Sequence, residues 1–273
     1  MKILIAADME GVTGVTTWEQ VTPGHAEYDR FRRLMTQDVN AAVRGACDGG
    51  ADEIIVADGH WHGSNILVEE LDQRARLNSG SPSPFSMMQG IDESVDGVFF
   101  VGYHARSGSA NAILDHTWSS RTVANIWLNE LLTGEYGLNA ALAGHFGVPV
   151  ILASGDQTAC GQMSDQLGEI ETAVVKKASG RFAAECLAPP LTQELIYEAA
   201  MRAVERLSEG DGPDPFILDT PVRVMVEFST SDMADRAAML PFTRREDRCI
   251  TFTAQEMETA YNAFRSMVTM ASG

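Results

Sequence analysis

The sequence predicts an α/β fold with a mostly parallel central sheet, helices on both faces and a smaller C-terminal α/β segment. Short, continuous apolar runs recur along the first half of the chain, and stretches with helical periodicity separate them. Strands that are apolar throughout are typical of parallel sheets covered by helices on both sides. A stretch dense in Gly, Pro and Asp, residues 208–215, then precedes a shorter tail of strands and one helix.

The elements of the first part follow from these patterns in chain order. Residues 26–48 carry Phe31, Leu34, Met35, Val39 and Val43 at helical spacing. Residues 79–86 contain two prolines and predict a loop. The apolar runs predict strands at 2–6, 53–57, 97–103 and 148–154, and a second helix is expected at roughly 135–146.

Residues 112–128 differ from the rest of the first part. Two stretches, AILDHTW and RTVANIWL, flank the polar SSR and predict a hairpin or a pair of extended arms. No repeat of the length expected for a solenoid or a propeller is present.

The tail predicts two strands, 222–228 and 249–253, and a final helix. Thr253 and Glu256 are spaced as a capping box that would begin this helix. Apolar residues at helical spacing, which we expect to pack in the core, follow: Met257, Tyr261, Phe264 and Val268. The chain therefore divides into a larger α/β domain, 1–208, and a smaller α/β segment, 209–273, packed on it.

Composition restricts the partners of the protein. Its 273 residues include 38 acidic and 20 basic ones, a formal charge of −18, which repels nucleic acid and anionic lipid. No apolar run approaches the roughly 20 residues that cross a bilayer, and the N-terminus is too short and too quickly acidic for a signal peptide. The four scattered cysteines lack CxxC spacing and indicate reduced thiols. We expect a cytoplasmic protein with neither nucleic-acid nor membrane partners.

Polar side chains cluster at the carboxyl ends of the predicted strands, where ligands bind in open α/β sheets. Each alone has an ordinary explanation, such as a turn or a helix N-terminus. Four of the six histidines fall at these points, whereas His25 and His145 lie in predicted helical segments and are expected to be structural. In chain order the cluster contains Asp8, Glu10, Asp58, His60, His62, His104, His116 and Glu135.

This mixture of imidazoles and carboxylates, without thiolates, suits zinc or a similar divalent ion. It offers more ligands than one tetrahedral zinc needs, and an aspartate can bridge two ions with its two oxygens. Two ions roughly 3.5–4 Å apart would share a hydroxide and polarise a carbonyl. The pattern therefore predicts a metallohydrolase. Other catalytic layouts fit less well, because the chain has no GxSxG, no GxxxxGK[ST] and, after its first strand, EGVTGV in place of GxGxxG.

Five ordered blocks of the sequence resemble the zinc-dependent D-aminopeptidase family of dipeptide-transport operons, peptidase family M55. The likeness covers nearly the whole chain and is most specific in residues 1–160. The blocks are AADMEGVTGV, ADGHWHGSNI, GYHAR, DHTW and GEYGLNAALAGHFGVPVILASGDQ.

The resemblance implies a role for each matching residue. His116 would be the catalytic histidine, acting as base, acid, oxyanion stabiliser or nucleophile. Asp58 would orient a metal ligand without binding the metal itself, and His62 would be peripheral. The ligands of two zinc ions per chain, with the aspartate bridging, would be Asp8, Glu10, His60, His104 and Glu135. Lys176 and Arg181 match a basic block of the family. They could receive a peptide carboxylate or a neighbouring subunit, but we expect them to form surface ion pairs.

The function implied by the resemblance is that of a two-zinc aminopeptidase. It would hydrolyse the N-terminal residue, expected to be D-configured, from short peptides by a metal-bound hydroxide assisted by a histidine. The family also implies a homo-oligomer, possibly a decamer. Two alternatives are a related metal-dependent amidohydrolase of non-peptide amides and a non-enzymatic peptide-binding protein.

Overall fold

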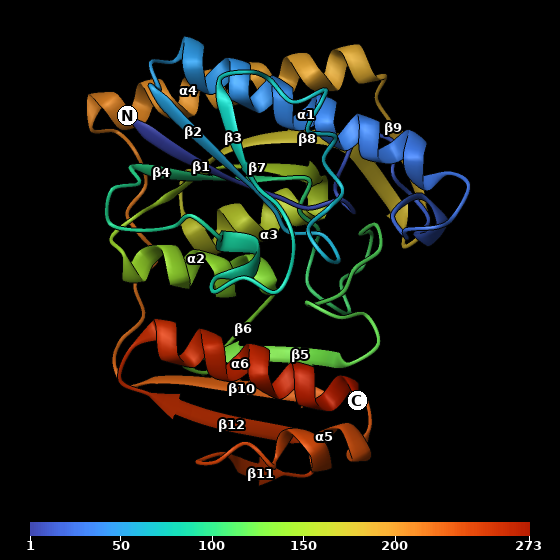
Figure 1. Ribbon diagram of the computed structural model, residues 1–273, viewed down its shortest axis with the longest axis vertical. Coiled ribbons are helices and arrows are strands. Elements are labelled where there is room, and N and C mark those ends of the chain that lie inside the picture. The colour runs from blue at the N-terminus through green and yellow to red at the C-terminus, as the bar shows by residue number, and fades with distance from the viewer.

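A computed structural model describes residues 1–273 and contains two sheets, one of seven strands and one of five. In Figure 1 the seven-stranded sheet lies in the upper part of the molecule between two layers of helices, and the five-stranded sheet lies below them. No helix has both the length and the apolar character needed to cross a membrane. The α/β fold expected from the sequence is confirmed, and the second sheet is antiparallel.

The larger sheet has the strand order β3-β2-β1-β4-β7-β8-β9 and is parallel except for the last pair. The chain moves outward from β1 to β3 and then returns to the other side of β1, so the order reverses between β1 and β4. In α/β sheets ligands bind where the order reverses. The strands are β1 (Lys2–Ala7), β2 (Glu53–Asp58), β3 (Ala75–Asn78), β4 (Gly97–Val101), β7 (Val150–Asp156), β8 (Glu171–Gly180) and β9 (Ala183–Cys186).

Helices cover both faces of this sheet because its central strands are apolar on both sides. Along β1, Ile3 and Ile5 pack in one core cluster, whereas Leu4 and Ala6 belong to the other. The first cluster is closed by α1 (Tyr28–Asp48) and α4 (Pro189–Glu209), and the second by α2 (Glu135–His145) and α3 (Gln157–Leu167). The predicted helices 26–48 and 135–146 are thus confirmed to within two residues.

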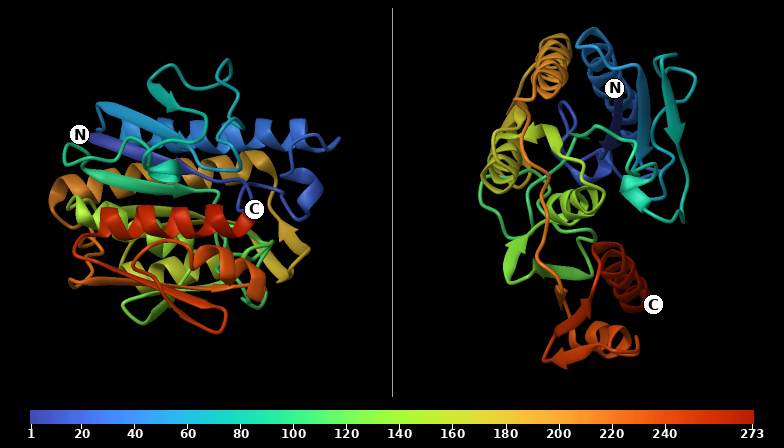
Figure 2. Two further views of the ribbon diagram at one scale, coloured as in Figure 1. Left: turned by 60° about the horizontal axis from the view of Figure 1, so that its bottom comes forward. Right: turned by 90° about the vertical axis from the view of Figure 1, so that its left-hand side faces the viewer.

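The smaller sheet lies at the end of the molecule opposite α1 and α4 (Figure 2, right). Its helix α6 lies between this sheet and α2 (Figure 1). The strand order is β11-β12-β10-β5-β6, antiparallel throughout, so β5 and β6 come from within the range 1–208. The elements are β5 (Val123–Leu128), β6 (Leu131–Thr133), β10 (Val222–Phe228), α5 (Ser231–Ala237), β11 (Arg244–Glu246), β12 (Cys249–Ala254) and α6 (Met257–Ser272).

One local prediction is wrong in part and another entirely. Residues 112–122 contain no strand, so the first of the two predicted arms is not extended; the second, RTVANIWL, contains β5, and the hairpin lies between β5 and β6. Leu114 and Trp118 have positive φ values of 49° and 61°, which an extended strand does not allow. Thr253 is not part of a capping box, because it pairs with Arg223 inside the sheet, and Glu256 precedes α6 without a side-chain cap. The predicted core residues of α6 are buried as expected.

Two glycines allow the segments that follow β1 and β4 to lie against each other. The Gly11 amide donates to the Gly102 carbonyl at 2.8 Å. A Cβ on Gly11 would lie 2.0 Å from the Tyr103 carbonyl oxygen, and Gly102 has a φ of 74°. This backbone contact brings the residues after β1 next to those after β4.

Candidate metal centre

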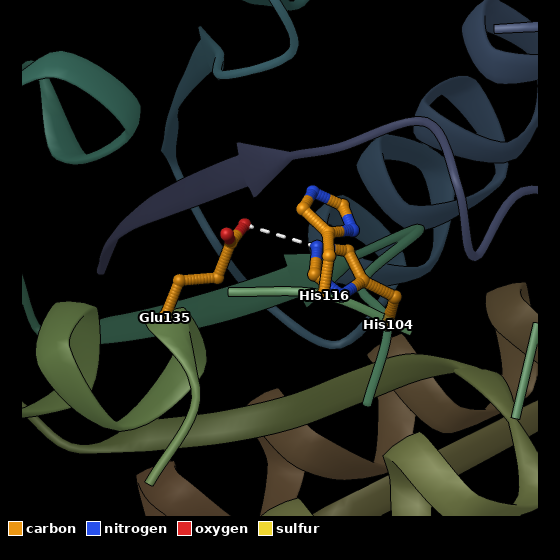
Figure 3. Close-up of side chains that lie close together, drawn as sticks. All are labelled: His104, His116 and Glu135. Atoms are coloured by element: carbon orange, nitrogen blue, oxygen red, sulfur yellow. Dashed lines mark ion pairs between the residues drawn. The ribbon is translucent and has the colours of Figure 1, made fainter. Parts of the chain in front are cut away.

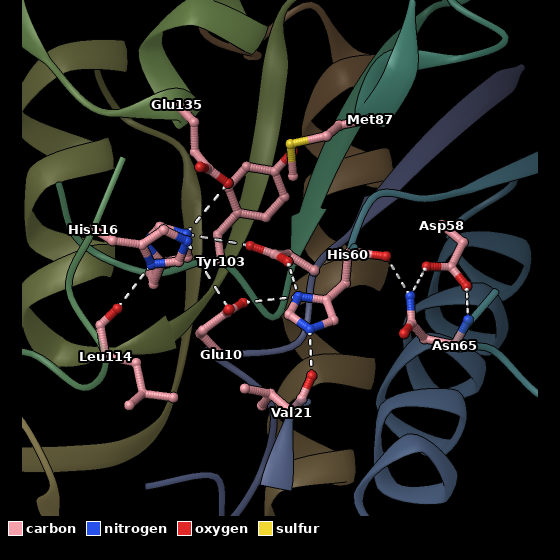
Figure 4. A network of polar contacts seen from close by, with 12 residues as sticks. Glu10, Val21, Asp58, His60, Asn65, Met87, Tyr103, Leu114, His116 and Glu135 are labelled. Atoms are coloured by element: carbon pink, nitrogen blue, oxygen red, sulfur yellow. Dashed lines mark hydrogen bonds and ion pairs between the residues drawn. The ribbon is translucent and has the colours of Figure 1, made fainter. Parts of the chain in front are cut away.

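Six of the side chains predicted for the site converge at the carboxyl ends of the parallel strands (Figure 4). Three of these side chains follow β1 and β4, the strands between which the strand order reverses. The others come from the loop after β2, the segment before β5 and the start of α2. All six are buried: Asp8, Glu10, His60, His104, His116 and Glu135.

Asp8 lies between two imidazoles and contacts each with a different oxygen. Its Oδ1 is 3.1 Å from His60 Nδ1, and its Oδ2 is 3.4 Å from His104 Nε2. The two remaining carboxylates lie on either side, with Glu10 Oε2 3.2 Å from His60 Nδ1 and Glu135 Oε1 3.2 Å from His104 Nε2. The two oxygens of Asp8 therefore face opposite sides of the cluster.

The second nitrogen of each imidazole is held by the backbone. His60 Nε2 lies 2.7 Å from the Val21 carbonyl oxygen, and His104 Nδ1 lies 3.0 Å from that of Ala105. A hydrogen bond on one ring nitrogen fixes the tautomer and aims the other nitrogen at the cluster. The ring orientations are therefore set before any ion binds.

His116 stacks on His104, with ring centroids 3.9 Å apart and planes 14° from parallel (Figure 3). Its Nδ1 lies 2.8 Å from the Leu114 carbonyl oxygen, and its Nε2 is 4.0 Å from Glu10 Oε1. Trp18 contacts the ring edge-on at 5.6 Å. The backbone bond leaves Nε2 as the free nitrogen, directed toward the carboxylates.

Glu135 occupies the first position of α2, which follows directly from the extended Gly134. Its Oε2 accepts a hydrogen bond from the Trp118 amide, two residues after His116. The same glutamate therefore faces His104 with one oxygen and fixes the backbone beside His116 with the other.

The buried charges of the cluster shift one another's pKa values strongly. Burial and the neighbouring Glu10 raise the pKa of Asp8 to about 7. Burial alone would raise the pKa of Glu10, but His60 and His116 hold it well below its usual range. Burial opposes the charged imidazoles, yet Glu10 and Asp8 hold the pKa of His60 well above its ordinary value, and Glu135 raises that of His104 to about 10.

His116 shows the opposite shift. Burial and the neighbouring His104 lower its pKa, so its imidazole is neutral at neutral pH. Of the three imidazoles in the cluster, His116 is therefore the one equipped to accept a proton.

The residues present fit divalent ions. Glu10 Oε2 and His104 Nε2 are buried and make no hydrogen bond, which is costly unless another partner binds them. Two groups of three residues have ligand atoms within 4.8 Å of one another. The first is Asp8, Glu10 and His104, and the second is His104, His116 and Glu135. Oxygen and imidazole donors without thiolates suit zinc. His116 thus lies within ligand distance of the cluster, although its predicted role is catalytic.

Asp58 supports the loop after β2 and does not touch the His60 ring. Its carboxylate accepts hydrogen bonds from the Asn65 amide, the Asn65 side chain and the Ile66 amide, at 2.6 to 2.8 Å. Asn65 Nδ2 also donates to the His60 carbonyl oxygen at 2.6 Å, and Tyr28 donates to Asn65 Oδ1. Asp58 therefore acts on His60 through Asn65 and the backbone (Figure 4).

The remaining histidines lie outside the cluster. His62 is exposed and contacts only the neighbouring Trp61 ring. His25 precedes α1 instead of lying within a helix, and His145 ends α2; both are exposed. Arg181 forms an ion pair with Asp115 at 2.9 Å, as expected for a partly exposed side chain.

Lys176 was expected in a surface ion pair, and this prediction is wrong. The side chain is 1% exposed, and its Nζ donates to the carbonyl oxygens of Glu10, Val12 and Val15 at 2.6 to 2.8 Å. Burial lowers its pKa to about 8. Lys176 therefore holds the segment that carries Glu10. Its apolar neighbours in β8 gave a signal for burial, but nothing in the sequence shows which carbonyls it binds.

Comparisons with known proteins agree with this geometry. A profile of peptidase family M55, described as D-aminopeptidase, matches residues 1–266. The D-aminopeptidase of Bacillus subtilis (strain 168) is 33% identical over 273 residues, covering 99% of this chain and 98% of that protein. A solved structure of the Zn-dependent D-aminopeptidase DppA from Bacillus subtilis, described as a self-compartmentalizing protease, superposes with a TM-score of 0.96 at 32% identity. It covers 100% of this chain and 98% of that one.

Proposed function

Because the chain belongs to peptidase family M55 and is a metallo-aminopeptidase, we propose that it uses two zinc ions to remove an N-terminal D-residue from short peptides. The position of Asp8 between two imidazoles carries this proposal, since its two oxygens are directed to opposite sides of the cluster. The Zn dependence of the similar Bacillus structure supports the choice of metal.

We assign the two ions to the five ligands expected from the sequence. Asp8 would bridge them, with Glu10 and His60 on one side and His104 and Glu135 on the other. This division follows the contacts in the structure, in which each glutamate lies against one imidazole. Bound zinc supplies Lewis acidity, which polarises the scissile carbonyl and activates water at neutral pH.

His116 is assigned the proton transfers. Its Nδ1–H donates to the Leu114 carbonyl oxygen, so Nε2 carries the lone pair that faces the cluster. A neutral imidazole whose pKa is lowered by burial accepts a proton from water and later delivers it to the leaving amine. Trp18 and the His104 ring hold this imidazole between them.

The proposed assembly is a homo-oligomer, with a decamer as the expected size. The similar Bacillus structure is described as self-compartmentalizing, which supports the proposal. Two of the most exposed apolar side chains, Met239 and Phe242, lie in the loop between α5 and β11 and are 72% and 93% exposed. Apolar side chains exposed to this degree are suited to contacts between subunits.

The proposed function is tested by combining elemental analysis with a stereochemical substrate panel. We expect two zinc ions per chain and hydrolysis of D-aminoacyl p-nitroanilides and short D-peptides, with little turnover of the L-isomers. Exclusive cleavage of non-peptide amides would instead identify an amidohydrolase. Fewer than one divalent ion per chain, with no hydrolysis after zinc is added, would identify a peptide-binding protein.

A further inference from the structure

Three fully buried polar side chains connect α6 to the candidate metal centre. Tyr261 Oη in α6 lies 3.1 Å from Asn139 Oδ1, and Asn139 Nδ2 donates to Tyr103 Oη at 3.0 Å. All three residues are 0% exposed. They come from α6, α2 and the end of β4, so the path joins the C-terminal segment to the larger sheet.

The two inner members of this path are adjacent to candidate ligands. Tyr103 directly precedes His104 in the chain, and Asn139 lies one helical turn after Glu135 on the same side of α2. Asn139 and Tyr103 therefore lie on the same backbone segments as Glu135 and His104, whose Oε1 and Nε2 atoms are 3.2 Å apart.

The Tyr261 hydroxyl contacts the Asn139 amide directly. It lies 3.1 Å from both the Asn139 amide oxygen and the Phe85 carbonyl oxygen, and the amide NH2 faces the Tyr103 hydroxyl and, at 3.4 Å, Met87 Sδ. Without this hydroxyl the Asn139 oxygen would be buried with no donor. A half-turn of the amide would then place this oxygen against the Tyr103 hydroxyl, which can donate to it, and would exchange donor and acceptor at Tyr103.

A second set of contacts from α6 reaches the same site. The Trp118 ring packs edge-on against Tyr261 and Phe264, with centroids 6.1 and 5.1 Å away. The Trp118 amide donates to Glu135 Oε2, and Trp118 is two residues from His116. Helix α6 thus packs on the residue whose backbone amide holds Glu135.

We propose that Tyr261 is a positioning residue for the metal centre, acting through Asn139 and Tyr103 on His104 and Glu135. This inference rests on the proposed zinc site. It assigns the 209–273 segment a part in the site in addition to packing, because the segment supplies the donor that fixes the Asn139 amide.

The test is a zinc titration of metal-free protein against a chromophoric chelator, with Tyr261→Phe as the variant. This change removes the hydroxyl and keeps the ring that packs on Trp118. We expect the apparent zinc affinity to fall about tenfold, in the range seen when residues that orient metal ligands are altered. The circular dichroism spectrum should stay as in the unaltered protein.

Two controls separate this effect from a general loss of stability. Tyr197→Phe removes a hydroxyl in α4 that bonds Asp48 far from the site, and its zinc affinity should be unchanged. Val268→Ala lowers the packing of α6 without touching the path, and should reduce the unfolding midpoint while leaving zinc affinity unchanged.

Wild-type zinc affinity in Tyr261→Phe would overturn the inference, as would an equal loss in Val268→Ala, since α6 would then act through stability alone. If Tyr261→Phe does not fold, Tyr261→Trp, which retains a buried N–H donor, should bind zinc better than Tyr261→Leu, and equal affinities would also overturn it. Failure of the unaltered protein to bind zinc would contradict the proposed function instead.

Discussion

At the scale of single residues, the chemistry depends on which nitrogen of each histidine is free. His60, His104 and His116 each give one nitrogen to a backbone carbonyl and direct the other into the cluster. The carboxylates hold the first two in a protonated form, whereas His116 is left neutral. The same side-chain type thus has two roles because the neighbouring charges differ.

His116→Ala should retain the bound metals and lose most turnover. The imidazole is assigned the proton transfers, which typically contribute about 10²- to 10⁴-fold to a rate. Elemental analysis and kcat on one substrate would be measured on the same sample. His62→Ala, an exposed histidine from the neighbouring loop, is the control and should behave as the unaltered protein. Loss of metal in His116→Ala would make His116 a ligand.

Zinc binding to the metal-free protein should release at least two protons per chain near neutral pH, since zinc requires neutral imidazoles and ionised carboxylates. The carboxylates raise the pKa of His60 well above its ordinary value and that of His104 to about 10, and burial raises that of Asp8 to about 7, so these groups carry protons that zinc must displace. The apparent zinc affinity should therefore increase as the pH rises. Calorimetry in two buffers of different ionisation enthalpy measures this release, and identical heats in both buffers would contradict the prediction.

At the scale of elements, β8 holds the segment after β1 in place. This segment carries Glu10, and three of its carbonyl oxygens accept hydrogen bonds from the ammonium of Lys176. Gly11 and Gly102 bring the same segment against the end of β4. These contacts fix a segment without regular secondary structure, so that the Glu10 carboxylate is held toward the cluster.

Lys176→Met should lower the free energy of unfolding by roughly 3 kcal/mol, because three buried carbonyls lose their donor. It should also weaken zinc binding, since the segment that carries Glu10 is released. Urea unfolding and zinc titration are the measurements. Lys177→Met, at the adjacent exposed position, is a matched control that should change neither. Unaltered stability in Lys176→Met would show that the hydrogen bonds contribute nothing.

At the scale of the whole molecule, the two sheets are joined by exchange of elements. β5 leaves the larger part of the chain to pair with β10, β6 pairs with β5, and α6 packs back on α2. The division of the chain at residue 208 stays a prediction. The predicted linker, residues 208–215, begins at the end of α4, which extends to Glu209.

The protein should sediment as a large homo-oligomer, with the proposed decamer as the expected size. Exposed apolar side chains such as Phe242 favour association because it removes them from water. Multi-angle light scattering after size exclusion gives the mass directly. A monomer at micromolar concentration would contradict this prediction.

The sequence by itself determined the strands of the parallel sheet, and with them the members of the site. Runs such as 53–57 are apolar on both faces, and the residues that follow each run must lie at one edge of the sheet. The convergence of Asp8, His60 and His104 was predictable for this reason, and so was the burial of Met257 and Phe264 at helical spacing.

Only the tertiary structure decided the contacts that cross between elements. The hairpin partner of β5, the carbonyls that bind Lys176 and the path from Tyr261 to Tyr103 join residues far apart in the chain. Periodicity reports whether a side chain is buried, but it does not report which buried partner it meets. A polar group's partner is fixed by how whole elements pack, and that information is spread over the entire chain.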